Sequence, residues 1–350
     1  MYCGPWRNSV SPRAALFAVV LSWVLLLGAC GDAADKGKPA VITGPTMGTS
    51  YAVKFFDNDV EVAALQSQID ELLERINEQM STWRSDSELS RFNSYRGLDW
   101  FPVSAGTAYV VDAAAAISAL SGGAFDVTVG PIVNLWGFGP ERGTAELPSR
   151  QQIEETMERV GYRRLSARSS PAALRKQHPD MYVDLSAIAK GFAVDEIARL
   201  LDGRHIRSYL VEIGGELRAR GSKRDGSPWK VAIEQPLPGE RSVQNIVALR
   251  DRAIATSGDY RNYVEEDGKR YSHTINPRTG RPIAHGLASV SVIGDSAMGA
   301  DALATAIMVM GPEEGYQLAL DEALAVQLIV RSGDQFRVLA TPRFEGYSPR

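Results

Sequence analysis

The chain has little cysteine, no basic run and no hydrophobic run of transmembrane length, and each shortage excludes a class of protein. Its 350 residues contain two cysteines, Cys3 and Cys30, so a disulfide framework cannot hold the fold together. The net charge is −4, and basic and aromatic residues do not interleave, which argues against nucleic acid as a partner. The apolar run at residues 14–29 is short for a membrane span.

What remains is an ordinary globular composition, with 44% hydrophobic and 23% charged residues. A chain of this length can bury a large core and can form one large domain or two small ones. No long repeat and no Pro-rich linker interrupts residues 41–345. We therefore expect one compact domain over this range.

The N-terminus has the pattern of a secretion signal. Arg7 and Arg13 precede the apolar run, which ends in LGAC at Cys30. Small residues before a cysteine match the bacterial lipobox, a special case of the signal peptide. This pattern predicts a signal peptide at 1–29, a lipidated Cys30 followed by a tether at 30–40, and a membrane-anchored lipoprotein on the periplasmic or extracytoplasmic face. A simple signal anchor is the alternative.

Hydrophobic periodicity beyond the tether predicts an α+β domain. Apolar residues at helical spacing predict a helix over 60–80, and Ser104 and Ser149 can cap helices at 105–120 and 150–160. A fourth helix is expected near 187–201, a buried helix at 299–311 and a short helix at 313–323. Strands are expected at 51–56, 181–185, 207–213, 216–220, 229–235, 245–249, 252–256, 287–293, 325–331 and 335–340.

Residues 181–195, MYVDLSAIAKGFAVD, are unusually informative. The apolar residues alternate at strand period, and Asp184 interrupts them before a helix that begins with small residues. A carboxylate, close-packing small residues and Lys190 describe a turn built around a charged group. The alternative is a strand–helix junction with an Asp cap near the helix start.

Residues 299–311, GADALATAIMVMG, form a second such segment. Asp301 and Thr305 are the main polar residues of a helix that is otherwise apolar, and they share one face because they are four residues apart. Two hard oxygens one turn apart suit Mg²⁺. Alternatively, Asp301 lies in the first turn of the helix and Thr305 bonds its own backbone.

A third segment, residues 271–282 (YSHTINPRTGRP), contains a turn at 276–280 that is typical of a hairpin. His273 precedes this turn. Arg278 and Arg281 are residues that an anionic ligand favours.

Together these segments resemble the ApbE family of FAD:protein FMN transferases. The signatures DLSAIAKGFAVD, SHTINPRTGRP and ADALATA occur in the family's order, after TMGTSYAV, MSTWRSDSELSRFN and GGAFDVTVGPIVNLWGFG. The resemblance covers about residues 41–345. It implies a single compact α+β domain with mixed or antiparallel sheets and flanking helices, in one or two lobes with FAD in a cleft between them.

The resemblance also implies roles for particular residues. Mg²⁺ is expected on Asp301, Thr305 and the backbone carbonyl of Ala187. Trp83 is expected to stack on a flavin ring, with a core aromatic as the alternative, and Lys190 to meet the charge of FAD, with a solvated lysine as the alternative. The expected cofactor-binding residues are Met47, Trp83, Ala124, Phe125, Asp126, Asp184, Lys190 and His273.

The implied reaction is Mg²⁺-dependent transfer of FMN from FAD to a Thr or Ser hydroxyl of an exported electron-transfer protein, with release of AMP. His273 and Asp301 are both candidates for the general base. Two other functions remain possible: a Mg²⁺-dependent FAD pyrophosphatase that gives FMN and AMP, and a flavin-binding lipoprotein without catalysis. An Asp301/Thr305 metal pair argues against the last, because storage alone needs no metal at the pyrophosphate.

Overall fold

The computed structural model describes residues 37–57, 59–141, 147–237, 242–258, 263–266, 269–333 and 335–349. The chain divides into two units, residues 1–38 and 39–350. Cys30 lies outside the described residues, so its lipidation stays a prediction. Within the described ranges, no helix has the length and apolar character needed to cross a membrane.

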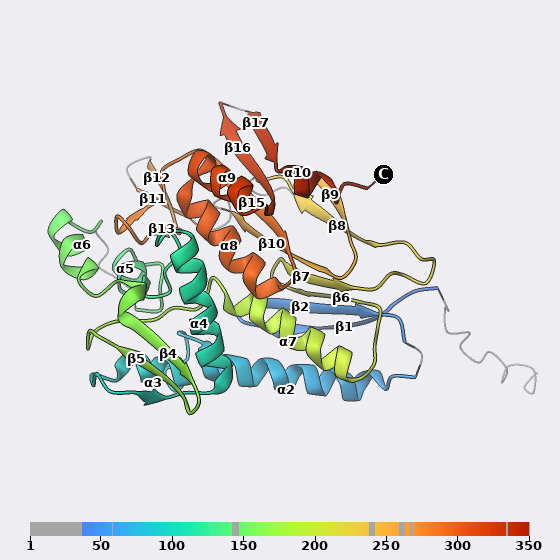
Figure 1. The fold of residues 1–350 in the computed structure, drawn as a ribbon, viewed down its shortest axis with the longest axis horizontal. Coiled ribbons are helices and arrows are strands. Elements are labelled where there is room, and N and C mark those ends of the chain that lie inside the picture. Colours follow the sequence, from blue (N-terminus) through green and yellow to red (C-terminus); the bar gives the residue numbers. More distant parts are fainter. Residues whose placement is uncertain are drawn as a thin grey trace, which may run out of the picture. The chain divides into compact units, whose positions relative to one another are not determined.

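An eight-stranded sheet lies at the centre of the second unit, and each of its neighbouring strand pairs is antiparallel (Figure 1). Across the sheet the order is β1 (Ala40–Thr46), β2 (Thr49–Phe55), β6 (Tyr209–Ile213), β7 (Glu216–Arg220), β10 (Arg252–Gly258), β15 (Leu287–Gly294), β16 (Ala325–Ser332) and β17 (Gln335–Ala340).

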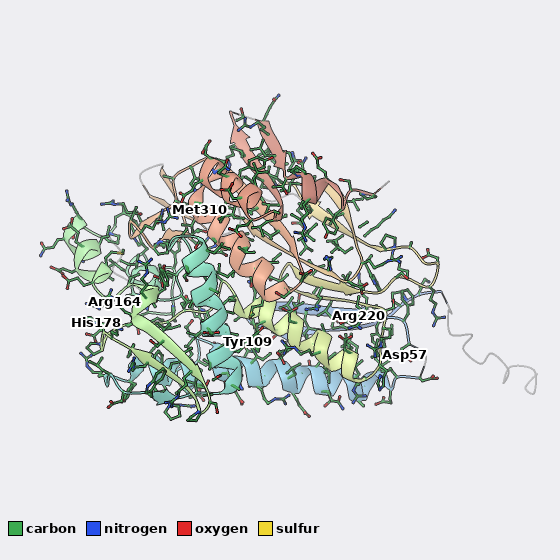
Figure 2. All side chains as sticks on the ribbon, viewed as in Figure 1. Asp57, Tyr109, Arg164, His178, Arg220 and Met310 are labelled. Atoms are coloured by element: carbon green, nitrogen blue, oxygen red, sulfur yellow. The ribbon has the colours of Figure 1, made fainter. Side chains whose placement is uncertain are left out.

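Helices cover one face of this sheet, and their side chains fill the space against it (Figures 1 and 2). α7 packs on β6 and β7, while α8 packs on β10, β15 and α7. α8 is buried almost all round because nearly every residue in it is small or apolar. The helices on this face are α2 (Val62–Met80), α7 (Ala189–Gly203), α8 (Ala297–Met310) and α9 (Pro312–Asp321), and α4 (Ala105–Leu120) packs beside them against α8.

A separate hairpin, β8 (Trp229–Glu234) with β9 (Val243–Leu249), packs on the opposite face. Successive residues of a strand point to opposite faces. In β10, Ala253 accordingly joins the core beneath α7, whereas Ile254 joins a second core with Trp229 and Val231. The large sheet therefore has a helical layer on one face and the β8–β9 hairpin on the other.

The remaining elements are short. Their bounds are α3 (Glu88–Ser94), β3 (Phe101–Pro102), α5 (Gly130–Leu135), α6 (Arg150–Met157), the 3₁₀ turn Tyr162–Arg164, β4 (Leu165–Ser169), β5 (Ala172–Lys176), β11 (Tyr263–Glu266), β12 (Lys269–Ser272), β13 (Ile275–Asn276), β14 (Arg281–Pro282) and α10 (Pro342–Glu345). A three-stranded sheet has the order β3-β5-β4, and β13 pairs with β14 in the hairpin expected around residues 276–280.

The α+β class and the antiparallel arrangement agree with the expectation from the sequence, as do the caps at Ser104 and Ser149. The expected strand at 181–185 is wrong. Met181, Val183 and Leu185 are fully buried, but this stretch pairs with no strand. Its alternation reflects burial of every second side chain in an extended loop. The hairpin of β4 and β5 was not expected from the sequence.

Candidate functional site

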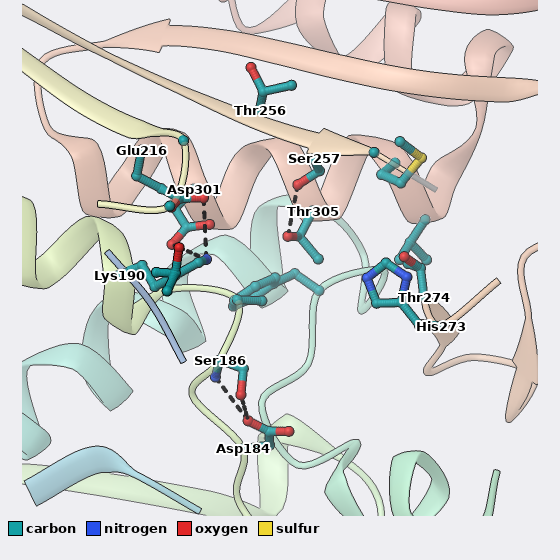
Figure 3. Close-up of a pocket in the computed structure, with 18 of the residues that line it drawn as sticks. Asp184, Ser186, Lys190, Glu216, Thr256, Ser257, His273, Thr274, Asp301 and Thr305 are labelled. Atoms are coloured by element: carbon teal, nitrogen blue, oxygen red, sulfur yellow. Dashed lines mark hydrogen bonds and ion pairs between the residues drawn. The ribbon is translucent and has the colours of Figure 1, made fainter. Parts of the chain in front are cut away.

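A cavity of about 930 Å³ lies within the second unit. Its walls come from distant parts of the chain: Trp83 after α2, the loop after α4, the loop before α7, and parts of β7, β8, β10 and α8. Figure 3 shows side chains from these segments converging on one space. The volume is in the range of cofactor-binding pockets in proteins.

Two carboxylates and one lysine form a buried cluster at one wall of the cavity (Figure 3). Lys190 Nζ lies 3.2 Å from Glu216 Oε1 and 3.8 Å from Asp301 Oδ2. Glu216 is 4% exposed and Asp301 is 3% exposed. Glu216 Oε2 accepts no hydrogen bond from the described residues. One ammonium thus faces two buried carboxylates, an arrangement that leaves negative charge available for a cation.

The charges of this cluster shift each other's pKa. Burial raises the pKa of Glu216 to about 7; the nearby Asp301 adds to the rise and Lys190 opposes it. Burial likewise raises the pKa of Asp301, against the effects of Lys190 and the Gly191 N–H. Burial alone would lower the pKa of Lys190, but Asp301 and Glu216 raise it above its ordinary value. Lys190 is therefore a paired lysine, which contradicts the alternative of a solvated helix-start lysine.

The position of Asp301 is set by close packing of α7 against α8. A Cβ on Gly191 would lie 2.4 Å from the carbonyl oxygen of Ala297, so only glycine allows this approach. The Gly191 N–H can then donate to Asp301 Oδ2 at 3.0 Å. Asp195, one turn further along α7, accepts hydrogen bonds of 3.0 Å from the N–H groups of Ala297 and Met298 at the start of α8. α7 therefore caps and orients the helix that carries Asp301.

Asp301 and Thr305 both line the cavity, as their spacing on one helix face predicts. Asp301 is not in the first turn of α8, because the helix begins at Ala297 and has no acidic residue in that turn. The Thr305 hydroxyl lies 3.2 Å from the Ser257 hydroxyl on β10. These contacts therefore do not support the alternative in which the helix dipole stabilises Asp301 in the first turn. They also do not support the alternative in which Thr305 bonds its own backbone.

The donor set fits a hard cation. Asp301 can supply a carboxylate and Thr305 a hydroxyl, and Ala187 lines the same cavity. Oxygen ligands of this kind are those that Mg²⁺ prefers, usually together with waters and phosphate. Within the described ranges, no group of three or more His, Cys, Asp or Glu side chains could hold a metal alone. A cation here therefore needs ligands from backbone, hydroxyl or phosphate oxygens.

The loop before α7 carries Asp184 and Ala187 to the cavity. Asp184 Oδ1 accepts a 2.9 Å hydrogen bond from the Ser186 N–H and a short one from the Ser186 hydroxyl, which closes a tight turn. The helix itself starts after Ile188 without a side-chain cap. Asp184 is accordingly a turn residue that borders the cavity, and not the helix cap that the sequence left as an alternative.

Aromatic and acidic residues after α2 and α4 complete the wall. Trp83 is 70% exposed and borders the cavity, so it is not a core aromatic. Ala124 and Phe125 are buried beside it. The carboxylate of Asp126 is engaged, since it accepts from the Thr128 N–H and hydroxyl and from the backbone of residue 162. Asp126 thus shapes the loop with its side chain.

Met47 and the two arginines are placed differently from the expectation. Met47 is in the turn between β1 and β2 at φ 47° and packs against the main core; it does not line the cavity, whereas Thr49 and Ser50 do. The Arg278 guanidinium bonds Glu314 and the Ser121 carbonyl outside the cavity. Arg281 is exposed and does not line it either.

His273 does line the cavity, and its ring contacts Phe138 edge-on, with the ring centres 6.5 Å apart. Figure 3 shows His273 away from Lys190, with Thr305 between them. Glu216, Ser257 and Asp195 were missed by sequence reasoning. A signal existed for Glu216, because it follows Gly214 and Gly215, whose positive φ values of 61° and 112° turn the chain sharply back.

The chain is similar to known flavin transferases. A model described as the ApbE family matches residues 47–329. The FAD:protein FMN transferase of Vibrio cholerae serotype O1 is 46% identical over 331 residues, which covers 94% of this chain and 98% of the relative. That of Escherichia coli K12 is 41% identical over 343 residues, with 96% and 97% covered.

Solved structures of flavin transferases are also similar to this chain. The flavin transferase ApbE from Vibrio cholerae superposes with a TM-score of 0.82 at 46% identity, covering 89% of this chain and 99% of that one. The apo form of the Pseudomonas stutzeri flavinyl transferase ApbE also gives a TM-score of 0.82, at 41% identity, covering 89% and 96%.

Proposed function

The chain belongs to the ApbE family, and we propose that its cavity binds FAD and transfers the FMN half to an acceptor protein. Its relatives are FAD:protein FMN transferases, and the chain is a transferase of this kind. The observation that carries the assignment to this cavity is the ion pair of Lys190 with Asp301 at its wall, where Thr305 lines the cavity one helical turn from Asp301. A cation and a pyrophosphate both need such charges.

The flavin would occupy the aromatic side of the cavity. Trp83 is available for stacking because most of its surface is exposed at the rim. Ala124, Phe125 and Asp126 form the adjoining wall, and Asp184 borders it. Aromatic side chains bind planar rings through stacking worth about 1–3 kcal/mol per ring. Met47 supports the neighbouring β1–β2 turn from outside the cavity.

The pyrophosphate would lie toward the buried cluster. Lys190 would meet its negative charge, and this requires Lys190 to exchange part of its contact with Glu216 for the phosphate. Asp301, Thr305 and the Ala187 carbonyl would hold Mg²⁺, which, when bound, neutralises phosphate charge and stabilises the charge that develops on AMP.

The reaction exchanges one phosphorus–oxygen bond for another. A Thr or Ser hydroxyl oxygen of the acceptor bonds to the phosphorus of the FMN half. The bond from that phosphorus to the bridging oxygen breaks, and AMP leaves with that oxygen. We assign the hydroxyl proton to His273, because Asp301 is already engaged by the Gly191 N–H and Lys190. General-base help of this kind contributes about 10²–10⁴-fold.

The acceptors would be exported flavin-carrying proteins of electron-transfer complexes. Support for this comes from the signal-like N-terminus, which would place the enzyme on the extracytoplasmic face through a lipid on Cys30. The net charge of −4 and the absence of a basic run argue against nucleic acid as a partner.

The test is an incubation of the purified full chain with FAD, Mg²⁺ and candidate acceptor proteins. We expect fluorescence that stays with the acceptor after denaturation, together with an equal amount of AMP. Asp301→Asn serves as the inactive control. If AMP and free FMN form while no acceptor becomes labelled, the chain is an FAD pyrophosphatase. If FAD binds and neither product forms, it is a flavin-binding protein.

A further inference from the structure

One strand edge of the structure faces the cavity. Residues 231–234 of β8 line the cavity, whereas no residue of β9 does. In an antiparallel pair, alternate residues direct their N–H and C=O groups to the partner strand and the others direct theirs outward. In the part of the chain that the structure describes, β8 pairs with β9 and with no other strand. Among the described residues, the backbone of Val231, Ala232 and Ile233 makes no further hydrogen bond.

The two outer edges of the eight-stranded sheet lie away from the cavity. β1 and β17 are the outer strands of the eight-stranded sheet, and neither lines the cavity. The outer edge of β9 is partly occupied, because the Ala248 N–H donates to the carbonyl oxygen of Tyr347 at 2.8 Å. β13, a two-residue edge strand, contributes one residue, Ile275, to the cavity wall, whereas β8 contributes four consecutive residues, 231–234. β8 is therefore the longer strand edge that borders the cavity.

Beside this edge is an exposed apolar surface. Ala232 is exposed, and its cross-strand partner Ile246 on β9 is 42% exposed on the same face. Val243, further along β9, is 59% exposed. The other face of the hairpin is buried, with Val231 at 8% and Ile233 at 3% exposure. A strand added to β8 would thus have the buried face of Val231 and Ile233 on one side and the apolar surface of Ile246 and Ala232, which also lines the cavity, on the other.

We propose that the β8 edge receives the acceptor protein, whose modified segment binds in extended form as an additional antiparallel or parallel strand. This inference rests on the proposed function, since a transferase that labels a protein must admit a polypeptide to its cavity. Addition of a strand at a free edge gives affinity through main-chain hydrogen bonds, and side-chain pockets on the two faces give specificity. An edge that is left open would otherwise promote unwanted pairing.

The pleat of the added strand predicts the acceptor's sequence pattern. Side chains alternate between the two faces of a strand. The Thr or Ser that receives FMN must point into the cavity, so the residues directly before and after it point to the opposite face. The set of alternate residues that lies over Ala232 and Ile246 should be small or apolar. The residues two positions away should again face the cavity.

The decisive variants place a positive charge on the exposed face of the β8–β9 hairpin, which carries Ala232 and Ile246. Ile246→Arg changes an exposed residue that does not line the cavity, so the fold and the release of AMP from FAD without acceptor should be unchanged. Transfer to the acceptor should fall about tenfold, the effect of roughly one lost favourable contact. Ala232→Arg, directly on β8, should lower transfer further. Val338→Arg is the matched control, because Val338 is 40% exposed on the edge strand β17.

A second measurement tests the backbone pairing directly. Proline cannot donate a ladder hydrogen bond. A proline scan through the acceptor segment should therefore lower transfer at alternate positions, whose N–H groups face β8. Equal effects at every position, or none, would overturn the docking mode.

Failure of the docking inference can be distinguished from failure of the proposed function. Wild-type transfer rates in both Ala232→Arg and Ile246→Arg overturn the inference while the proposed function stands. A wild-type dimer that these variants convert to monomer, seen by sedimentation, shows that a second copy uses the edge and also overturns it. A wild-type chain that releases AMP but labels no acceptor rejects the proposed function itself.

Discussion

Asn93 and Val183 are ninety positions apart and exchange two hydrogen bonds. The Asn93 Nδ2 group donates to the Val183 carbonyl oxygen at 2.9 Å, and the Val183 N–H donates to Asn93 Oδ1 at 2.8 Å. The side chain of Asn93 thus pairs with Val183 as a neighbouring strand would. This contact holds the extended loop that carries Asp184 and Ala187 to the cavity.

We predict that Asn93→Ala weakens FAD binding and lowers stability. The change removes both hydrogen bonds and leaves the backbone of a fully buried residue unsatisfied, at a cost of about 1–3 kcal/mol per group. FAD titration and urea unfolding measure the two effects. Ser94→Ala is the control, because Ser94 is exposed on the same helix and bonds only the Ser90 carbonyl. Equal behaviour of the two variants would mean that the loop keeps its shape without Asn93.

Lys176 holds the same loop from another direction. Its ammonium donates to the carbonyl oxygens of Phe92, Asn93 and Met181 at 3.0 to 3.2 Å, and the residue is 1% exposed. Burial lowers its pKa to about 8 from 10.5, while Asp180 opposes the shift and Arg96 adds to it.

This shift predicts a pH dependence of stability. Between pH 8 and pH 10.5 the unfolded chain keeps the Lys176 proton more readily than the folded chain, so a rise in pH favours folding. The unfolding free energy of the wild type should therefore rise relative to Lys176→Met over this interval, by at most about 3.5 kcal/mol, since one pKa unit corresponds to about 1.4 kcal/mol. Below pH 8 the difference should be constant. Parallel curves throughout would show that Lys176 titrates normally.

Asp301→Asn should abolish release of AMP from FAD while most of the flavin stacking remains. The substitution keeps the shape but removes the charge that Mg²⁺ needs. Wild-type activity should require added Mg²⁺ and stop with chelator. Thr305→Val should be milder, because a neutral hydroxyl is the weaker ligand and water can replace it. Full, chelator-resistant activity in Asp301→Asn would remove the metal from this position.

Trp83→Ala should weaken FAD binding by about 1–3 kcal/mol, the range for loss of one stacking contact. The fold should be unaffected because the ring is 70% exposed. Leu98→Ala provides a comparison, since Leu98 is 52% exposed and does not line the cavity. Titration of flavin fluorescence measures affinity, and thermal unfolding measures stability. An unchanged affinity with a large fall in melting temperature would make Trp83 a structural residue.

Cys30→Ser should prevent lipidation of the chain. We expect soluble protein or an uncleaved precursor in place of a membrane-bound mature form, because the thiol is the point of lipid attachment in a lipobox. Fractionation of cells and intact mass of the product measure this. A variant that is still cleaved, lipid-modified and membrane-bound would rule out Cys30 as the anchor.

Local sequence alone is enough to predict the helices with strong periodicity and clear caps, and the position of Asp301 and Thr305 on one helix face. These features depend on neighbours within four residues, so local chemistry settles them. It also determined the family, because several ordered motifs are specific even where each alone is weak.

Which charged side chains meet depends on the packing of distant parts of the chain. Glu216 opens a strand, Lys190 begins a helix and Asp301 lies in another helix; nothing local indicates that the three converge. The alternation at 181–185 was interpreted as a strand, since burial of every second residue gives the same pattern whether the partner is a strand or the side chains of Asn93 and Lys176. Long-range packing, which short-range periodicity does not record, made that choice.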